Sequence, residues 1–138
     1  MRNMLFEIML VLLGLLTACS HSNTDIYGTS YYSNPAWQTI TATDARSMME
    51  LNDNFILLDV RTIAEFQNIR IEGAVLIPYN EISNRALKEL SDKGAIILVY
   101  CQSGRRSALA AANLVELGFS SVYDFGGIIN WPYETISG

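Results

Sequence analysis

The sequence has few of the residues that enzymes use most often for covalent and metal chemistry. Among 138 residues it contains one histidine, His21, and two cysteines, Cys19 and Cys101. A single histidine near the N-terminus excludes the paired cysteine and histidine of a cysteine protease by any ordinary geometry, and leaves too few ligands for a metal. We therefore expect no metal and no cofactor.

Positive charge is also scarce. The chain carries 9 Lys and Arg against 14 Asp and Glu, for a net charge of -5 at pH 7. Proteins that hold nucleic acid do so through a basic surface, so we expect no nucleic-acid partner. Against this acidic background the adjacent residues Arg105 and Arg106 stand out as a local cationic pair.

A long apolar run occurs only at the start of the chain. Arg2 precedes apolar residues 8–16, a run shorter than the roughly 20 residues that span a bilayer. This pattern predicts an export signal over residues 1–19. Its last four residues, Leu-Thr-Ala-Cys, resemble the lipobox of bacterial lipoproteins, which predicts lipidation of Cys19. An uncleaved N-terminal membrane anchor is the alternative.

Lipidation of Cys19 would decide both location and cysteine chemistry. A lipid anchor would hold the protein on a membrane of the bacterial cell envelope, facing the periplasm, and Ser20 fits sorting to the outer membrane of a Gram-negative organism. An acylated cysteine cannot pair, so Cys101 would be a lone thiol in an oxidising compartment. A buried structural cysteine is the other interpretation of Cys101.

Length and patterning divide the chain into three parts. One compact core uses roughly 100 to 150 residues, so a single domain is expected. Residues 20–36 are polar, without helical or alternating period, and we interpret them as a flexible tether. In residues 37–138 short apolar runs alternate with helical patterns, which indicates an α/β domain with a mostly parallel sheet.

The predicted strands and helices follow from these runs and from local helix signals. Strands are expected at residues 38–40, 55–60, 74–77, 95–100 and 122–125. Thr41 with Asp44 and Thr62 with Glu65 have the spacing of capping boxes, which predicts helices after residues 40 and 61. Two further helices are expected at residues 81–90 and 107–117.

The last of these helices lies next to the second cysteine. We expect it to bury Ala108, Ala111, Ala112 and Val115 and to end at Gly118.

A short segment around Cys101 has the features of an anion cradle. After the strand at 95–100 come Cys101, Gln102, Ser103, Gly104, Arg105 and Arg106, and a helix follows at once. Inward backbone amides and the helix dipole would stabilise a thiolate at the first position, and Gly104 gives the turn its conformational freedom. We expect Cys101 to be a partly exposed loop residue. Either arginine could instead be a solvated surface residue, and the sequence favours neither.

The segment VYCQSGRRS resembles the active loop of rhodanese-like domains, and three further landmarks of that family occur in the expected order. LLDVRTIAEF at residues 57–66 is similar to its first signature, IEGAVLIP at 71–78 to its second, and GFSSVYDFGGIINW at 118–131 to its closing segment. The resemblance covers residues 37–138. It implies a three-layer α/β domain with a mostly parallel five-stranded sheet flanked by helices.

The resemblance also implies a sulfurtransferase of the thiosulfate sulfurtransferase type. Cys101 would take the outer sulfur of thiosulfate or a persulfide, carry it as a cysteine persulfide, and deliver it to a thiol or cyanide. Substrate binding falls to the loop, that is, to Gln102, Ser103, Gly104, Arg105 and Arg106. The partners implied are a small anionic sulfur donor and a thiol acceptor, for a protein working as a monomer.

Four positions near the family's signatures bear on this interpretation. Arg70 stands where the second signature often has a histidine. Glu65 stands near the position at which some thiosulfate-specialised members place a substrate-facing arginine. Asp59 and Arg61 lie at a strand end where they could contact the active site, and the favoured role for them is a buried pair that holds loops together.

Three other functions remain open. A phosphatase or arsenate reductase of related architecture needs an arginine where this chain has Ser107, since Arg106 comes one residue too early. A non-catalytic rhodanese-like binding module on an envelope complex is the second. A thiol-redox role is the third, although no second cysteine is available to resolve a mixed disulfide.

Overall fold

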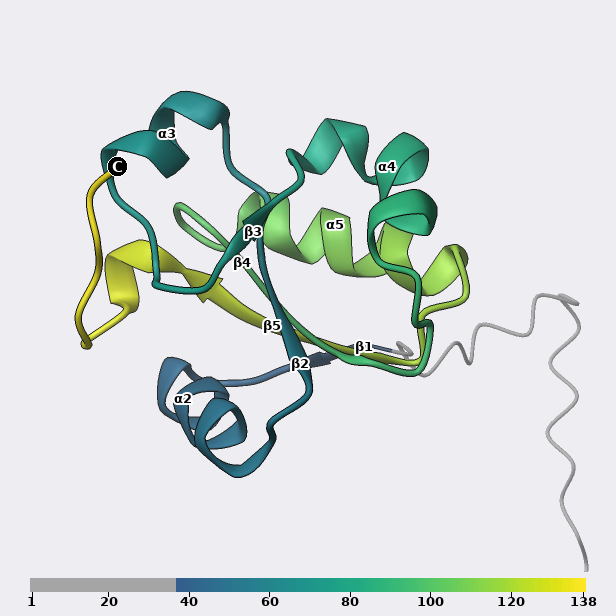
Figure 1. The fold of residues 1–138 in the computed structure, drawn as a ribbon, viewed down its shortest axis with the longest axis horizontal. Helices are drawn as coiled ribbons and strands as arrows, with labels where there is room; N and C mark the ends of the chain where they lie inside the picture. The colour runs from purple at the N-terminus through teal and green to yellow at the C-terminus, as the bar shows by residue number, and fades with distance from the viewer. Residues whose placement is uncertain (1–36) are drawn as a thin grey trace, which may run out of the picture. The chain divides into compact units, whose positions relative to one another are not determined.

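The computed structural model describes residues 37–138. The predicted signal at 1–19, its lipidated Cys19 and the tether at 20–36 lie outside the described residues. Within residues 37–138 the strands form one five-stranded sheet in the order β1-β5-β4-β2-β3, and every neighbouring pair is parallel (Figure 1). The predicted α/β fold with a mostly parallel five-stranded sheet is confirmed.

The observed elements match the expected ones, with ends that differ by one or two residues. The strands are β1 (Trp37–Thr39), β2 (Phe55–Asp59), β3 (Val75–Leu76), β4 (Ile96–Cys101) and β5 (Ser121–Gly127). The helices are α2 (Ala42–Leu51), α3 (Ile63–Asn68), α4 (Ile82–Glu89) and α5 (Arg105–Glu116), with 3-10 turns at η1 (Tyr79–Glu81) and η2 (Ile128–Asn130).

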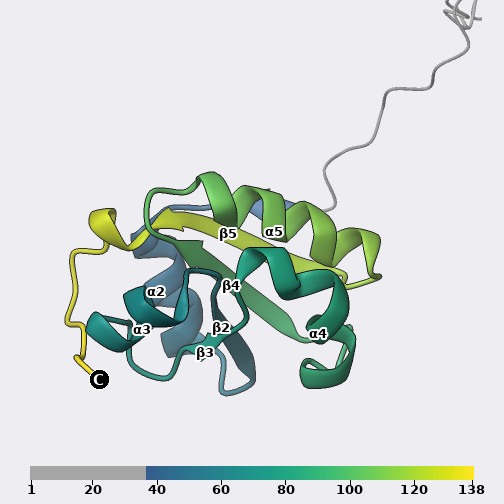
Figure 2. The same ribbon diagram turned by 90° about the horizontal axis from the view of Figure 1, so that it is seen from above.

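Helices cover both faces of the sheet, which gives three layers. Helices α4 and α5 lie on one face and α2 lies on the other (Figures 1 and 2). Both faces of the sheet are apolar and must be covered. Residues of the central strand β4 alternate between two apolar clusters, one on each face. Ile97, Val99 and Cys101 belong to the cluster that includes residues of α4 and α5, and Leu98 and Tyr100 belong to the cluster that includes Ala45 of α2.

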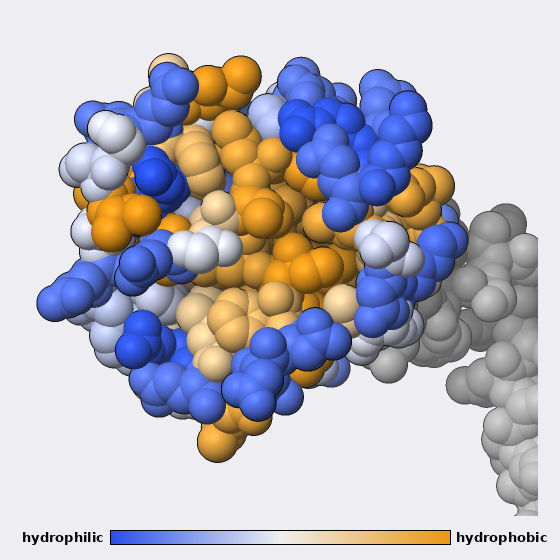
Figure 3. All heavy atoms as spheres, in the orientation of Figure 1, coloured by the Kyte–Doolittle hydropathy of each residue, from blue (hydrophilic) through white to orange (hydrophobic). Residues whose placement is uncertain are grey.

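One edge of the sheet is apolar and open. Strand β3 has a single neighbour, β2, and its Val75 is 46% exposed. In the view of Figure 3, apolar side chains gather at the centre of the face where β2 and β3 lie, with hydrophilic residues around them.

Both predicted capping boxes are present. The backbone N–H of Asp44 donates to the Thr41 hydroxyl at 3.0 Å, and that of Glu65 donates to the Thr62 hydroxyl at 3.3 Å. Each carboxylate in turn accepts from the backbone N–H of its threonine. Local sequence therefore fixes the starts of α2 and α3.

The buried face of α5 differs from the prediction. Of the four residues expected to be buried, only Ala111 is, and the buried set is Ser107, Ala110, Ala111 and Leu114. Apolar residues lie almost all round this helix, so their spacing does not determine which face turns inward. At the other end the prediction is confirmed, because Gly118 has φ +94 and its N–H donates to the Val115 carbonyl at 2.9 Å.

None of the helices in residues 37–138 combines the length and apolar character needed to cross a bilayer.

Candidate active site

The candidate site lies between the ends of β2 and β4, the two neighbouring strands after which the chain continues to opposite sides of the sheet. From β2 the chain continues to its neighbour β3, and from β4 it continues to β5 on the opposite side. The loops that leave the carboxyl ends of β2 and β4 therefore diverge, and open parallel sheets bind ligands at such a point. Asp59 ends β2 and Cys101 ends β4.

The prediction that Cys101 is a partly exposed loop residue is wrong. Cys101 is the last residue of β4, and its exposed fraction is 0%. The alternation that places Val99 in the apolar cluster beside α5 places Cys101 there as well. The loop after β4 then folds back over the sulfur, and the backbone N–H of Gly104 donates to Sγ at 3.1 Å.

The loop is tight because glycines form it and support it. Gly104 has φ +102 and occupies the N-cap position of α5, a conformation that L side chains rarely adopt. Gly127 of β5 lies directly beneath the loop. A Cβ on Gly127 would clash with the Gln102 carbonyl oxygen and lie 2.7 Å from the Ser103 Cα. Sequence reasoning missed this glycine, since only the fold brings β5 under the loop.

Hydrogen bonds make Cys101 more acidic than an ordinary thiol. Burial by itself raises the pKa of the Cys101 thiol, because it disfavours the thiolate. The backbone N–H and hydroxyl of Ser107 and the backbone N–H groups of Gly104 and Ser103 act in the opposite direction. Together they outweigh burial, so the pKa is lowered from its ordinary value of 9.0. The predicted anion cradle is thus formed by donors from the loop and the first turn of α5.

Ser107 is a second residue that sequence reasoning did not assign to the site. Its side chain is fully buried. Its single hydroxyl proton has three acceptors within reach, namely the Gly104 carbonyl at 2.9 Å, the Gly126 carbonyl at 3.3 Å and the Cys101 sulfur. We assign the proton to the sulfur when Cys101 is a thiolate, because a charged acceptor forms the stronger hydrogen bond.

The structure separates the two arginines of the loop. Arg105 is exposed, whereas Arg106 is half-buried and forms a bidentate ion pair with Glu65 of α3. The two hydrogen bonds join Nη1 to Oε2 at 2.8 Å and Nη2 to Oε1 at 2.7 Å. The pKa of Glu65 is lowered from 4.5 to about 2, chiefly by this guanidinium and further by the hydrogen bonds from Thr62. Glu65 therefore holds an arginine in the first turn of α5.

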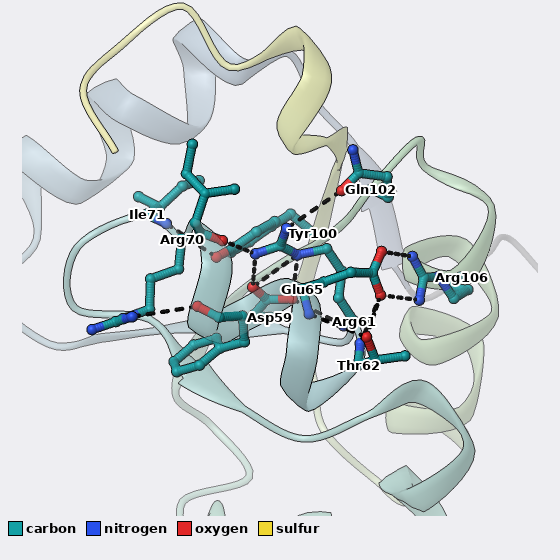
Figure 4. Close-up of polar contacts among 11 residues, drawn as sticks. Asp59, Arg61, Thr62, Glu65, Arg70, Ile71, Tyr100, Gln102 and Arg106 are labelled. Atoms are coloured by element: carbon teal, nitrogen blue, oxygen red, sulfur yellow. Dashed lines mark hydrogen bonds and ion pairs between the residues drawn. The ribbon is translucent and has the colours of Figure 1, made fainter. Parts of the chain in front are cut away.

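A buried polar network connects the loops that follow β2 and β4. Arg61 is 1% exposed and Asp59 is 0% exposed, and their side chains pair at 2.7 Å. Arg61 also donates to the Ile69 carbonyl at 2.6 Å and to the Gln102 side chain at 3.4 Å (Figure 4). As predicted, this pair joins loops. Arg61 also contacts Gln102, the residue that follows Cys101.

Arg70, at the position where the family often has histidine, lies away from this network. Its guanidinium stacks on the ring of Phe66 at 4.9 Å and donates to the carbonyl of that residue at 3.3 Å. Its backbone forms an antiparallel bridge with Ile136. Arg70 thus fixes the C-terminal segment of the chain against α3.

The hollows found at the surface are not lined by the loop that follows Cys101. One of about 430 Å³ lies between α2 and the C-terminal segment, and none of residues 101–106 lines it. Within residues 37–138 no group of three or more His, Cys, Asp and Glu side chains could hold a metal. The candidate site is therefore the cradle around Cys101.

A cysteine held at the carboxyl end of a central parallel strand, ringed by amides at a helix N-terminus, defines a class of α/β domains built for chemistry on sulfur or an oxyanion. Residues 41–132 match the family model of the rhodanese-like domain. The chain belongs to the rhodanese-like domain family.

Curated relatives of this family include short sulfurtransferases. The chain is 35% identical over 81 residues to the thiosulfate sulfurtransferase PspE of Escherichia coli, a match that covers 59% of this chain and 78% of the relative. It is 36% identical over 80 residues to a sulfurtransferase of Allochromatium vinosum, covering 57% and 73%. The match to the putative sulfur carrier protein YrkF of Bacillus subtilis is 34% over 91 residues, covering 65% of this chain and only 48% of that one.

Solved structures agree with the fold. A rhodanese with anions from E. coli superposes with a TM-score of 0.57 at 31% identity, covering 60% of this chain and 98% of that one. The rhodanese-like domain of the Alr3790 protein from Anabaena sp. gives a TM-score of 0.66 at 27% identity, covering 72% and 79%.

Proposed function

We propose that this protein is a sulfurtransferase that moves sulfane sulfur from thiosulfate or a persulfide donor to a thiol or cyanide acceptor through a persulfide on Cys101. The observation that supports it most is the lowered pKa of Cys101 inside a ring of hydrogen-bond donors. A lower pKa increases the fraction of Cys101 that is thiolate, the form that attacks sulfur, and so reduces the need for a general base. The similarity to thiosulfate sulfurtransferases supports the same reaction.

The transfer has two displacement steps. The Cys101 thiolate attacks the outer sulfur of thiosulfate, a new S–S bond forms, and the old S–S bond breaks with its electron pair leaving on sulfite. A thiolate or cyanide then attacks the terminal sulfur of the persulfide and restores the Cys101 thiolate. The donors on Gly104, Ser103 and Ser107 stabilise negative charge on sulfur before and after each step.

The burial of Cys101 bears on how the donor reaches it. With the sulfur 0% exposed, the outer sulfur of a donor must enter the space beneath the loop. Ser103 is exposed and Gln102 is half-buried, so these loop residues lie between the sulfur and solvent.

The test is turnover of the full chain with thiosulfate and with a persulfide donor, cyanide being the acceptor, beside Cys101→Ser. We expect turnover by the parent and none by the variant. A folded, reduced parent that turns over neither donor would contradict the proposal and favour a non-catalytic binding module.

We further propose that Cys19 carries a lipid and that the domain works in the cell envelope, facing the periplasm. The apolar run, the lipobox-like residues 16–19 and the polar residues 20–36 support this. Metabolic labelling with a fatty acid should mark the parent and leave Cys19→Ala unlabelled. Equal labelling of the parent and of Cys19→Ala, or no labelling of the parent, would contradict lipidation at Cys19.

A further inference from the structure

Arg106 lies within reach of the Cys101 sulfur, and one edge of its guanidinium is already occupied. Arg106 of α5 and Glu65 of α3 point toward one another in Figure 4, and their ion pair uses both carboxylate oxygens, at 2.7 and 2.8 Å. Their side chains are 25% and 29% exposed. A bidentate pair of this kind uses the Nη1–Nη2 edge of the guanidinium, one of the two edges through which it can hold a sulfonate or another oxyanion, and it offsets the positive charge.

Arg106 lies against two anionic groups at once. Its pKa is raised chiefly by the hydrogen bond to Glu65 and more weakly by the charge and hydrogen bond of Cys101. A donor seated on Cys101 would therefore meet the guanidinium and, just beyond it, the carboxylate. Any negative charge on the donor competes with Glu65 for Arg106 and is repelled by Glu65.

We infer that Glu65 is a specificity-determining residue, which withholds the charge of Arg106 from the donor and so favours persulfides over thiosulfate. Thiosulfate carries two negative charges, whereas the persulfide group carries at most one. The inference rests on the proposed sulfur transfer. It concerns only the choice of donor.

Glutamine at position 65 separates this electrostatic role from a structural one. Glu65 also completes the capping box of α3, accepting from the backbone N–H of Thr62 at 2.9 Å and from its hydroxyl at 2.8 Å. Glutamine serves in a capping box as well as glutamate does, so Glu65→Gln removes the charge and keeps the cap.

The chain offers a matched control in its other capping box. Asp44 occupies the same cap position in α2, where it contacts Thr41. Asp44→Asn makes the same change in net charge on the opposite face of the sheet.

The experiment measures kcat/KM of the full chain for thiosulfate and for mercaptoethanol persulfide, with cyanide as acceptor throughout. In Glu65→Gln we expect kcat/KM for thiosulfate to rise roughly tenfold, mainly through a lower KM, while the persulfide value changes by less than about twofold. The pH midpoint for alkylation of Cys101 should also fall. Asp44→Asn should leave kcat/KM for both donors and the pH midpoint for alkylation unchanged.

Equal changes for both donors, or a lower efficiency with thiosulfate, would overturn the inference while leaving the sulfur transfer intact. Turnover of neither donor by the parent would overturn both. If Glu65→Gln fails to fold, Arg106→Gln gives a second test. It leaves the Glu65 charge unopposed and should reduce thiosulfate turnover more than persulfide turnover, and an equal loss for both would again contradict the inference.

Discussion

At the scale of single residues, the acidity of Cys101 depends on a few donors, and Ser107 supplies two of them. Ser107→Ala removes the hydroxyl and keeps the backbone N–H, so we expect the pKa of Cys101 to rise, because the thiolate loses one hydrogen bond. The rate of alkylation by iodoacetamide against pH measures this, with Ser103→Ala, whose side chain is exposed, as the control. An unchanged midpoint would show that the hydroxyl does not serve the sulfur.

Gly127 is the other residue on which the loop depends. Gly127→Ala places a methyl group against Gln102 and Ser103, so we expect a loss of about 1–3 kcal/mol in the free energy of unfolding and a large loss of sulfur transfer. Gly94→Ala is the control, because Gly94 has an ordinary φ and its added Cβ would meet only an Asp92 side-chain oxygen, at 3.4 Å. Equal effects of the two substitutions in urea titrations would contradict the role given to Gly127.

Neither residue could be found from the sequence alone. Cys101 and its loop were predictable because a strand, a glycine and a helix start lie within a few residues of one another. Gly127 acts through a contact that exists only once β5 lies beside β4. Ser107 reaches the sulfur only once the loop after β4 has closed over it. The pairing of Glu65 with Arg106 joins positions 41 residues apart, and no local pattern announces it.

At the scale of elements, α3 is the helix with the least tertiary support. It has 6 residues and none of them is buried, so its capping box, the Glu65–Arg106 pair and its contacts with Arg70 and the C-terminal segment hold it in place. Because the pKa of Glu65 is lowered, the ionised carboxylate stabilises the fold, and this contribution is complete above 4.5, the value in an unfolded chain. It is lost as the pH falls from about 4.5 to about 2.

Amide hydrogen exchange at α3 measures this directly. We expect its protection to fall between pH 4.5 and about 2 after correction for the intrinsic exchange rate, while Glu65→Gln shows no such step. An equal step in both proteins would assign the effect to other carboxylates.

The helices and strands also show which structural features can be predicted from sequence patterns. The strands and the two capping boxes were predictable because their signals are local. The buried face of α5 was not, because alanines and leucines lie nearly all round it and packing against α4 and the sheet decides which of them turns inward.

At the scale of the whole molecule, the buried Asp59–Arg61 pair connects the carboxyl end of β2 to the loop after β4. Asp59→Asn would leave the Arg61 charge buried without its partner, so we expect the free energy of unfolding to fall by about 3 kcal/mol or more. Glu50→Gln, which breaks the exposed pair with Arg46, should cost less than about 1 kcal/mol. Urea titration of both variants tests this, and a small loss in Asp59→Asn would contradict it.

The central claim is that Cys101 carries the transferred sulfur. The most direct measurement is the intact mass of the full chain after exposure to thiosulfate and, separately, to a persulfide donor, without acceptor. We predict that the parent gains the mass of one sulfur atom, located on Cys101 by fragmentation, that cyanide removes it, and that Cys101→Ser gains nothing. A folded, reduced parent that gains no sulfur from either donor, or gains it equally in the variant, would contradict the claim.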